Sequence, residues 1–321
     1  MFTANTSNAI ALVAQAWGEE HVGEGDAIVT TIAEHHSNML SFAMLAARKD
    51  AHVVYLPLGP DGRIDQEAYV EALQLHPKIV CIAQVGNVLG IAAPVREMAE
   101  AAHAVGARFL LDAAQSFPHL KLDVATCGAD WVAFSGHKAY GPMGIGGLWI
   151  SPDVFAEMDP IVGGGGTVSH VSTDGYYLRP KTIQYELGTP PVSQAVGFAA
   201  AVNYLEDLGM DSVHRHAAVL TRYAACGLGG IECVSVLGDH SAPDGQNGLI
   251  SFSLCGVNPE LLALFLGKLE VAIRAGSHCA IPLQTSMGSL GVGRMSMGVY
   301  TVPAEIEAAC AAVEACRRVF A

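Results

Sequence analysis

The sequence predicts an α/β protein with a mostly parallel sheet in a large domain, followed by a smaller α+β domain. Over the first 150 residues, short apolar runs alternate with amphipathic stretches, as in strands joined by crossover helices. Polar residues follow several of these runs directly, at the edge where ligands bind in such folds. From about Pro190 the alternation gives way to two long helical patterns. We therefore expect a large domain over residues 1–190 and a smaller domain, with its linking helix, over residues 191–321.

The expected elements of the large domain follow from hydrophobic periodicity. A first helix opens at Thr6 and is broken at Gly18. The expected strands are residues 27–31, 52–56, 78–83, 109–111, 131–134 and 144–150. Between them we expect helices over residues 37–48, 66–75 and 95–105.

The expected elements of the smaller domain begin with two consecutive helices, over residues 192–208 and 210–226. Strands follow at residues 231–236 and 249–254, and a last helix begins at Pro303. Glycine and polar residues favour loops at residues 163–166 and 239–247.

Composition excludes several function classes. The 321 residues include 17 basic and 31 acidic residues, for a net charge of −14, so the chain is a poor partner for nucleic acid or an anionic membrane. Hydrophobic residues make up 51%, which excludes general disorder. No apolar run reaches the roughly 20 residues that cross a bilayer. The 35 glycines favour tight turns and close approach of the backbone to a ligand.

Cysteine usage and the first residues predict a cytoplasmic protein with reduced thiols. The chain starts without a basic segment or signal-peptide pattern, and its eight cysteines form no CxxC pair. The cysteines are residues 81, 127, 226, 233, 255, 279, 310 and 316. Most are expected to be small core residues.

Lys138 is the first candidate for chemistry. It follows an apolar strand in the segment FSGHKAYGP, residues 134–142. Such a lysine by itself is more often a surface residue of a loop. Here Ser135 and His137 can donate to a phosphate, and the flanking glycines allow close backbone approach. A lysine in a polar cleft at a strand end can form a Schiff base with an aldehyde cofactor.

Three further positions could surround such a cofactor. Asp112 ends a strand, where it could cap a helix or hold the protonated pyridine nitrogen of pyridoxal phosphate (PLP). Gln115 could reach the phenolic oxygen of the same ring. His35 could stack on the ring; a metal site shared with His36 is disfavoured, because adjacent residues of an extended segment point to opposite faces. The helix that opens at Thr6 offers a phosphate cradle.

These segments together resemble the fold-type I, class V aminotransferase-like PLP enzymes. The residues that carry the resemblance are EHHSN (34–38), QVGNVLG (84–90), DAAQ (112–115) and FSGHKAYGP (134–142), extended by GGGG (163–166), YELGTP (185–190) and RAGSHCA (274–280). Within that class the chain is similar to the group II, Suf-type cysteine desulfurases and the selenocysteine lyases. Members of this family usually carry an N-terminal segment ahead of the helix that begins here at Thr6, and we expect this chain to lack it.

The resemblance implies a role for each matching residue. Lys138 would be the Schiff-base lysine, Asp112 would pair with the pyridine nitrogen, Gln115 with the phenolic oxygen, and His35 would stack on the ring. The phosphate would be bound by Thr6, Ser7, Ser135 and His137, and by Thr189 from the other subunit of a homodimer. Asn87 would lie near the ring and the substrate carboxylate, Arg294 would clamp that carboxylate, and Arg274 would support the substrate end of the site.

Cys279 would be the nucleophile that takes sulfur from L-cysteine as an enzyme persulfide, with L-alanine as the other product. A buried core cysteine is the alternative, but Cys279 lies in a polar loop between Gly276 and Pro282, which favours the functional interpretation. A nearby Arg274 or His278 would lower the pKa of the thiol. The resemblance implies PLP as cofactor, a sulfur-acceptor protein as a further partner, and no metal.

Several alternatives stay open at this point. A selenocysteine lyase would use nearly the same residues, and another class V lyase, epimerase or aminotransferase would not use Cys279. A truncated, weakly active dimeric remnant that binds a scaffold is an alternative from a different class. A Rossmann-type dehydrogenase is disfavoured, because no GxGxxG follows the first strand.

Overall fold

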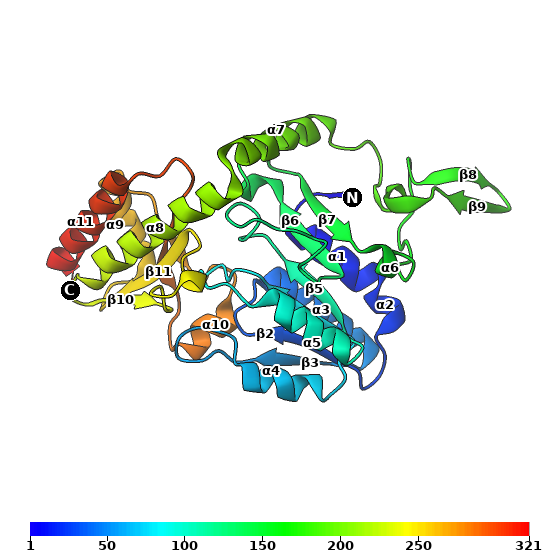
Figure 1. Ribbon diagram of the computed structural model, residues 1–321, viewed down its shortest axis with the longest axis horizontal. Coiled ribbons are helices and arrows are strands. Elements are labelled where there is room, and N and C mark those ends of the chain that lie inside the picture. Colours follow the sequence, from blue (N-terminus) through cyan, green and yellow to red (C-terminus); the bar gives the residue numbers. More distant parts are fainter. Residues whose placement is uncertain (321) are drawn as a thin grey trace.

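The computed structural model describes residues 1–320 and is built on a large sheet and a smaller sheet (Figure 1). The large sheet has seven strands, and neighbours from β3 to β6 are parallel, whereas β7 and β1 add antiparallel strands at one edge. The strands lie in the order β1 (Phe2–Thr3), β7 (Gly146–Ile150), β6 (Trp131–Ser135), β5 (Arg108–Asp112), β4 (Ile79–Ala83), β2 (Ala27–Thr31) and β3 (His52–Leu56).

Helices cover both faces of the large sheet, because its central strands are apolar on both sides. On one face Ile10 of α1 and Phe42 of α3 pack with Trp131. On the other face Tyr69 of α4 and Met98 of α5 pack with the sheet. The helices of this part are α1 (Thr6–Ala16), α2 (Gly18–His21), α3 (His36–Lys49), α4 (Gln66–Leu73), α5 (Val95–Ala104) and α6 (Pro152–Phe155), with the 3₁₀ helix η1 (Gly136–Lys138) after β6. The expected α/β class with a mostly parallel sheet is confirmed.

The smaller sheet is antiparallel and lies between the remaining helices. Its strands run in the order β10 (Val234–Leu237), β11 (Leu249–Leu254), β13 (Val292–Ser296) and β12 (Arg274–Gly276). Its core joins Leu220, Phe252 and Val313. The surrounding helices are α8 (Met210–Gly229), α9 (Pro259–Lys268), α10 (Ile281–Ser286), α11 (Pro303–Phe320) and the 3₁₀ helix η3 (Pro243–Gly245).

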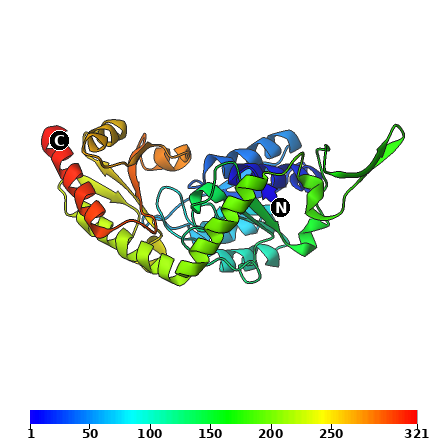
Figure 2. The ribbon, with the colours of Figure 1, turned by 90° about the horizontal axis from the view of Figure 1, so that it is seen from above.

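Two long helices connect the sheets. The helix α7 (Val192–Leu208) runs along the large part, and α8 continues from it toward the smaller sheet (Figure 2). The hairpin of β8 (Val168–Ser172) and β9 (Gly175–Leu178) follows the glycine loop at residues 163–166 and projects from the body (Figures 1 and 2). The 3₁₀ helix η2 (Lys181–Tyr185) lies between this hairpin and α7. The division of the chain near residue 190 stays a prediction.

The structure corrects several expected boundaries. A short helix, α2, follows α1 where the sequence indicated only a break. The helix α8 continues to Gly229, and β10 begins only at Val234, because residues 231–233 form a turn in which Cys233 has a φ of 64°. Within residues 1–320, no helix has both the length and the apolar character needed to cross a membrane.

Candidate active site

A polar pocket of about 290 Å³ lies at the carboxyl edge of the parallel strands, facing the smaller sheet. It gathers the predicted site residues except Thr189 and Cys279. Its lining comprises Asn5, Thr6, Ser7, His35, Ser37, Asn87, Asp112, Ala114, Gln115, Ser135, His137, Lys138, Arg274, His278 and Arg294.

Parallel strands explain why residues so distant in sequence meet here. Asp112 is the last residue of β5 and Ser135 the last of β6, and η1 carries Lys138 directly after that strand. His35 follows β2, and Asn87 follows β4. Since these four strands end at one edge of the sheet, their following residues share one space.

The first turn of α1 forms one end of the pocket. Thr6 N–H donates to Ser135 Oγ at 2.8 Å, and the two hydroxyl oxygens lie 2.6 Å apart. Asn5 caps the helix by accepting from Asn8 N–H at 3.0 Å. Gly146 permits this close packing, because a Cβ there would lie 2.4 Å from the Phe134 carbonyl oxygen. Hydroxyls beside a helix N-terminus suit an anionic phosphate.

The half-buried Lys138 and the buried Asp112 are opposite charges that both line the pocket. Asp112 is 4% exposed, and its Oδ1 accepts from Ala114 N–H at 2.8 Å. Burial raises the pKa of Asp112, and the Lys138 charge opposes that rise. Burial lowers the pKa of Lys138, and Asp112 opposes that change. Each group therefore stabilises the charge of the other in a poorly solvated place.

Two arginines form the opposite wall. Arg274 of β12 lies directly across from Arg294 of β13 in the register of the smaller sheet. Arg294 Nη1 donates to the Asn87 carbonyl oxygen at 2.8 Å, which joins the two parts of the chain. Burial, with the Arg274 charge, lowers the pKa of Arg294 to about 10, so its guanidinium still carries a full charge at neutral pH. Two like charges held together form a site for an anion.

Unpaired polar atoms show that this wall suits a polar ligand. Among the described residues, three buried atoms of the wall are without a hydrogen-bond partner: Arg294 Nε, Asn87 Oδ1 and His278 Nδ1. Buried polar atoms left unpaired cost stability, so they favour a ligand that would pair with them. With the phosphate cradle at one end, the buried Asp112 below and Lys138 beside it, the residues present fit PLP with a carboxylate substrate.

His35 is held in place as a neutral imidazole. It caps α3, with Nδ1 accepting from Ser37 N–H at 3.2 Å and lying 2.6 Å from Ser37 Oγ. Burial lowers its pKa to about 4, and the Lys138 charge adds to that effect. An uncharged flat ring fixed at the pocket edge is suited to stacking on a flat cofactor.

Glu34 is a residue that the sequence analysis did not single out. It is 2% exposed, and its carboxyl oxygens accept from Thr31 Oγ1 at 2.9 Å, Asn38 Nδ2 at 2.8 Å and Ala83 N–H at 2.9 Å. These bonds tie the ends of β2 and β4 to the first turn of α3, just below His35. The sequence contained one indication of this role: Glu34 is an acidic residue directly before the histidine pair, in a segment expected to follow a buried strand.

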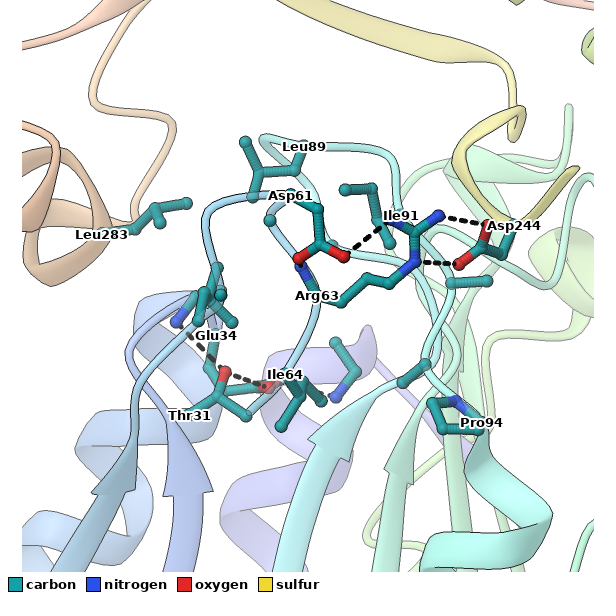
Figure 3. Close-up of a pocket in the computed structure, with 18 of the residues that line it drawn as sticks. Thr31, Glu34, Asp61, Arg63, Ile64, Leu89, Ile91, Pro94, Asp244 and Leu283 are labelled. Atoms are coloured by element: carbon teal, nitrogen blue, oxygen red, sulfur yellow. Dashed lines mark hydrogen bonds and ion pairs between the residues drawn. The ribbon is translucent and has the colours of Figure 1, made fainter. Parts of the chain in front are cut away.

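Glu34 also lines a second cavity, of about 460 Å³ (Figure 3). Thr31 and Glu34 lie on one side of it, and Arg63 lies on the other. Arg63 donates to both carboxylate oxygens of Asp244 at 2.7 Å, and to Asp61 at 3.0 Å. Since its cation is fully paired and most other lining residues are apolar, this cavity offers less for charged-group chemistry than the polar pocket.

Cys279 lies in a strained turn at the edge of the site. It has a φ of 58° and the preceding His278 has a φ of 54°, conformations that side-chain-bearing residues rarely adopt. The turn is held by His36 N–H, which donates to the Cys279 carbonyl oxygen at 2.7 Å. Cys279 is half-buried and does not line the pocket itself, but His278 beside it does.

His278, the residue before Cys279, has a buried side chain. Burial lowers the pKa of His278 to about 4, so this imidazole is neutral at neutral pH. The expected influence of Arg274 or His278 on the Cys279 thiol stays a prediction.

Thr189 is exposed in the segment between η2 and α7, outside the pocket. Its expected contact is with a partner subunit, so its role stays a prediction.

Comparisons with known proteins show the family of the chain. Residues 1–309 match the aminotransferase class-V family. The cysteine desulfurase of Haloferax volcanii is 39% identical over 321 residues, covering all of this chain and 75% of that protein. A probable cysteine desulfurase of Halalkalibacterium halodurans is 38% identical over 320 residues, and the match covers 78% of that protein.

Solved structures agree as well. The apo structure of a cysteine desulfurase from Thermococcus onnurineus matches with a TM-score of 0.95 at 34% identity, covering all of this chain and 79% of that one. The cysteine desulfurase CsdA from Escherichia coli matches with a TM-score of 0.95 at 30% identity, with the same coverage. The chain thus spans about three quarters of the length of these relatives. It belongs to the aminotransferase class-V family and, within it, to the cysteine desulfurases, which are PLP-dependent enzymes.

Proposed function

We propose that this chain converts L-cysteine to L-alanine, keeps the sulfur as a persulfide on Cys279, and passes it to an acceptor protein. Supplying sulfur for iron–sulfur cluster assembly is the general function of its family. One observation carries the proposal: Lys138 and the buried Asp112 share a pocket with two arginines and unpaired polar atoms, and Cys279 directly follows the lining residue His278.

In this proposal PLP is held by the pocket residues in the roles that the resemblance implies. Asp112 would bind the pyridine nitrogen and Gln115 the phenolic oxygen, and His35 and Asn87 would contact the ring. The phosphate is bound by Thr6, Ser7, Ser135 and His137, and by Thr189 of the other subunit. PLP, when bound, would supply an electron sink for the substrate α-carbon.

The substrate carboxylate is bound by Arg294. Its Nη1 already donates to the Asn87 backbone, which fixes the plane of the guanidinium and leaves Nε free for a ligand. The amide of Asn87 is fixed in turn, because its Nδ2 donates to the His278 carbonyl oxygen at 2.6 Å. Arg274 adds a second positive charge. The carboxylate is thus anchored, and the substrate orientation follows from it.

Lys138 moves the α-proton. Burial lowers the pKa of its ammonium group, with Arg294 and Arg274 contributing in the same direction. A lowered pKa increases the neutral fraction of Nζ, which is the form that accepts a proton from the substrate α-carbon.

Cys279 then acts as the nucleophile. Its thiolate sulfur bonds to the sulfur of the substrate, and the bond between that sulfur and the substrate β-carbon breaks. The electron pair of the broken bond stays with the β-carbon, which is protonated to give alanine. The half-buried position of Cys279 at the pocket edge leaves its sulfur within reach of an incoming acceptor.

We also propose a homodimer in a reducing, cytoplasmic compartment. Large apolar side chains are exposed on the projecting hairpin and on α7, among them Tyr176 at 67%, Tyr177 at 70% and Val196 at 68%. Exposed patches of this kind favour a protein interface. The thiol chemistry of Cys279 needs a reduced cysteine, and this supports the compartment.

The test is an assay of alanine and sulfide together after incubation with L-cysteine, PLP and a reductant. Lys138→Ala should abolish both products and the visible absorbance of the protein. Cys279→Ala should abolish sulfide release but keep the absorbance, and Cys127→Ala, in the large domain, should keep both. Full activity of Cys279→Ala would refute the assigned nucleophile. A parallel assay with L-selenocysteine distinguishes a selenocysteine lyase, which would prefer that substrate.

A further inference from the structure

Cys233 and Cys255 face each other at the outer end of the smaller sheet. The register of β10 and β11 pairs Val234 with Leu254, so the next pair outward is Cys233 with Cys255. The ladder continues there, because Cys255 N–H donates to the Cys233 carbonyl oxygen at 2.8 Å. Two cysteines that are 22 positions apart in sequence are thus brought together by strand pairing.

Strand geometry makes this pair suitable for a covalent link. Residues opposite one another in a hydrogen-bonded antiparallel pair have Cα atoms about 5.5 Å apart. Disulfides span Cα separations of about 4.4 to 6.8 Å. The hydrogen bond from Cys255 N–H to the Cys233 carbonyl oxygen holds the two residues close together, so a bond between their sulfur atoms is geometrically accessible.

Both thiols are accessible to solvent. Cys233 and Cys255 are free and exposed, in contrast to Cys81 and Cys316, which are fully buried. The two side chains interact. Desolvation is the largest cause of the raised pKa of Cys233, the Cys255 side chain raises that pKa further, and Arg317 opposes the rise. Cys233 also has a φ of 64°, in the left-handed region, so this turn is locally strained.

The pair lies away from the proposed catalytic site. At the inner end of β11, Ser251 Oγ donates to the Val88 carbonyl oxygen at 2.6 Å, next to Asn87 of the polar pocket. Cys255 lies four residues farther along an extended chain, which corresponds to roughly 13 Å. The pair is thus distinct from Cys279.

We propose that Cys233 and Cys255 form a second thiol site, a dithiol that exchanges with low-molecular-weight disulfides. One thiolate attacks a sulfur of the small disulfide, forms a mixed disulfide and releases one small thiolate. The other protein thiolate attacks the protein-bound sulfur of that mixed disulfide, forms the Cys233–Cys255 bond and releases the second small thiolate. The protein loses two electrons and two protons, and the small disulfide is reduced to two thiols.

The test treats the reduced, full-length chain with oxidised glutathione, quenches it with an alkylating agent, and maps its cysteines by peptide mass spectrometry. The expected result is a cross-linked peptide pair that carries Cys233 and Cys255 and no glutathione. In Cys233→Ser, the second step is blocked, so Cys255 should keep glutathione as a stable mixed disulfide. Cys255→Ser should trap it on Cys233.

The control is Cys226→Ser, which removes another exposed cysteine from the same part of the chain and should leave the cross-link unchanged. Circular dichroism of each variant checks that it is folded. The proposal is overturned if Cys233 and Cys255 both stay alkylated in the wild type, if each carries glutathione separately, or if either is linked instead to a different cysteine.

Discussion

The buried carboxyl of Glu34 dominates the pH response expected of single residues. Burial raises its pKa from 4.5 to about 8, and the charge of Asp112 adds to the effect. Between these two values the folded chain holds a proton that the unfolded chain has lost. Rising pH across this window therefore lowers the free energy of unfolding, by up to about 1.4 kcal/mol per pH unit.

Glu34→Gln keeps the shape of the side chain but cannot ionise. We predict that the difference in unfolding free energy between the variant and the wild type rises with pH from about 4.5 to about 8 and is constant beyond that range. Urea unfolding at a series of pH values measures it. The lowered pKa values of His35 and His278 act on both proteins and cancel in the difference. A pH-independent difference would contradict the buried, protonated carboxyl.

Arg294 is expected to act mainly in substrate binding. Its planar fork donates to the Asn87 backbone and leaves Nε unpaired, so Arg294→Lys keeps a charge but loses the bidentate geometry. We predict that KM for L-cysteine rises about ten- to a hundredfold, from the loss of a charge-assisted hydrogen bond. Steady-state kinetics measure KM, and PLP absorbance checks that the variant still binds the cofactor. An unchanged KM would rule out Arg294 as the carboxylate clamp.

Several site residues could be predicted from the sequence, but the neighbouring residues that hold them in place could not. Lys138 and Asp112 were predictable because each follows an apolar strand at the edge where parallel strands end. The role of Glu34 was not, because it depends on hydrogen bonds to Ala83 and Asn38 that arise only when β2, β4 and α3 meet. The neutral state of His278 likewise depends on its burial, which no local pattern encodes.

Among elements, the first turn of α1 depends on the strand beneath it. A Cβ at Gly146 of β7 would meet the Phe134 carbonyl oxygen at 2.4 Å and Asn5 Cα at 2.9 Å. Both are backbone atoms, so neither can move without displacing the strand or the helix cap. The phosphate-binding end of the pocket is therefore sensitive to a single methyl group on β7.

We predict that Gly146→Ala weakens PLP binding and destabilises the fold by about 1–3 kcal/mol, the usual cost of overpacking. Titration with PLP, followed by visible absorbance, and urea unfolding measure the two effects. Gly163→Ala is the matched control, because within the described residues its Cβ would have no neighbour within 4 Å. Wild-type PLP affinity in Gly146→Ala would show that the packing of α1 on β7 does not shape the cradle.

Elements with a clear period were predicted well, and short polar elements were missed. The helix α7 and the strand β11 have the bounds that periodicity indicated. The hairpin of β8 and β9 was missed because most of its residues are exposed, which leaves no alternation of apolar and polar side chains. The strand β12 has only three residues. Its pairing with β13, which brings Arg274 beside Arg294, was therefore not visible in the sequence.

For the whole molecule, contacts between the two sheet-bearing parts determine the pocket. Arg63, in the loop before α4, pairs with Asp244 (Figure 3) and with Asp239, and both aspartates lie after β10. Asn247 Nδ2 donates to the Gly90 carbonyl oxygen at 2.8 Å nearby. These bonds join the same two parts of the chain whose residues meet in the polar pocket.

We predict that Arg63→Lys lowers the free energy of unfolding by about 1–2 kcal/mol, because lysine cannot reproduce the two parallel hydrogen bonds to Asp244. The partners are partly exposed, so the loss should shrink at high salt. Arg96→Lys is the control, since Arg96 pairs with Glu100 on the exposed face of α5. Urea unfolding at low and high salt measures both variants, and equal losses would argue against a special role of Arg63.

The net charge of −14 describes the molecule as a whole but not its site, where Lys138, Arg274 and Arg294 gather. That local reversal of charge suits a phosphate and a carboxylate.

The central claim is that this pocket transfers sulfur from L-cysteine to Cys279. The most direct measurement is peptide mass spectrometry of the PLP-loaded protein after incubation with L-cysteine without reductant, followed by alkylation. The predicted result is one extra sulfur atom on the peptide that contains Cys279, absent in Lys138→Ala. Sulfur carried by a different cysteine, or retained on Cys279 in Lys138→Ala, would contradict it.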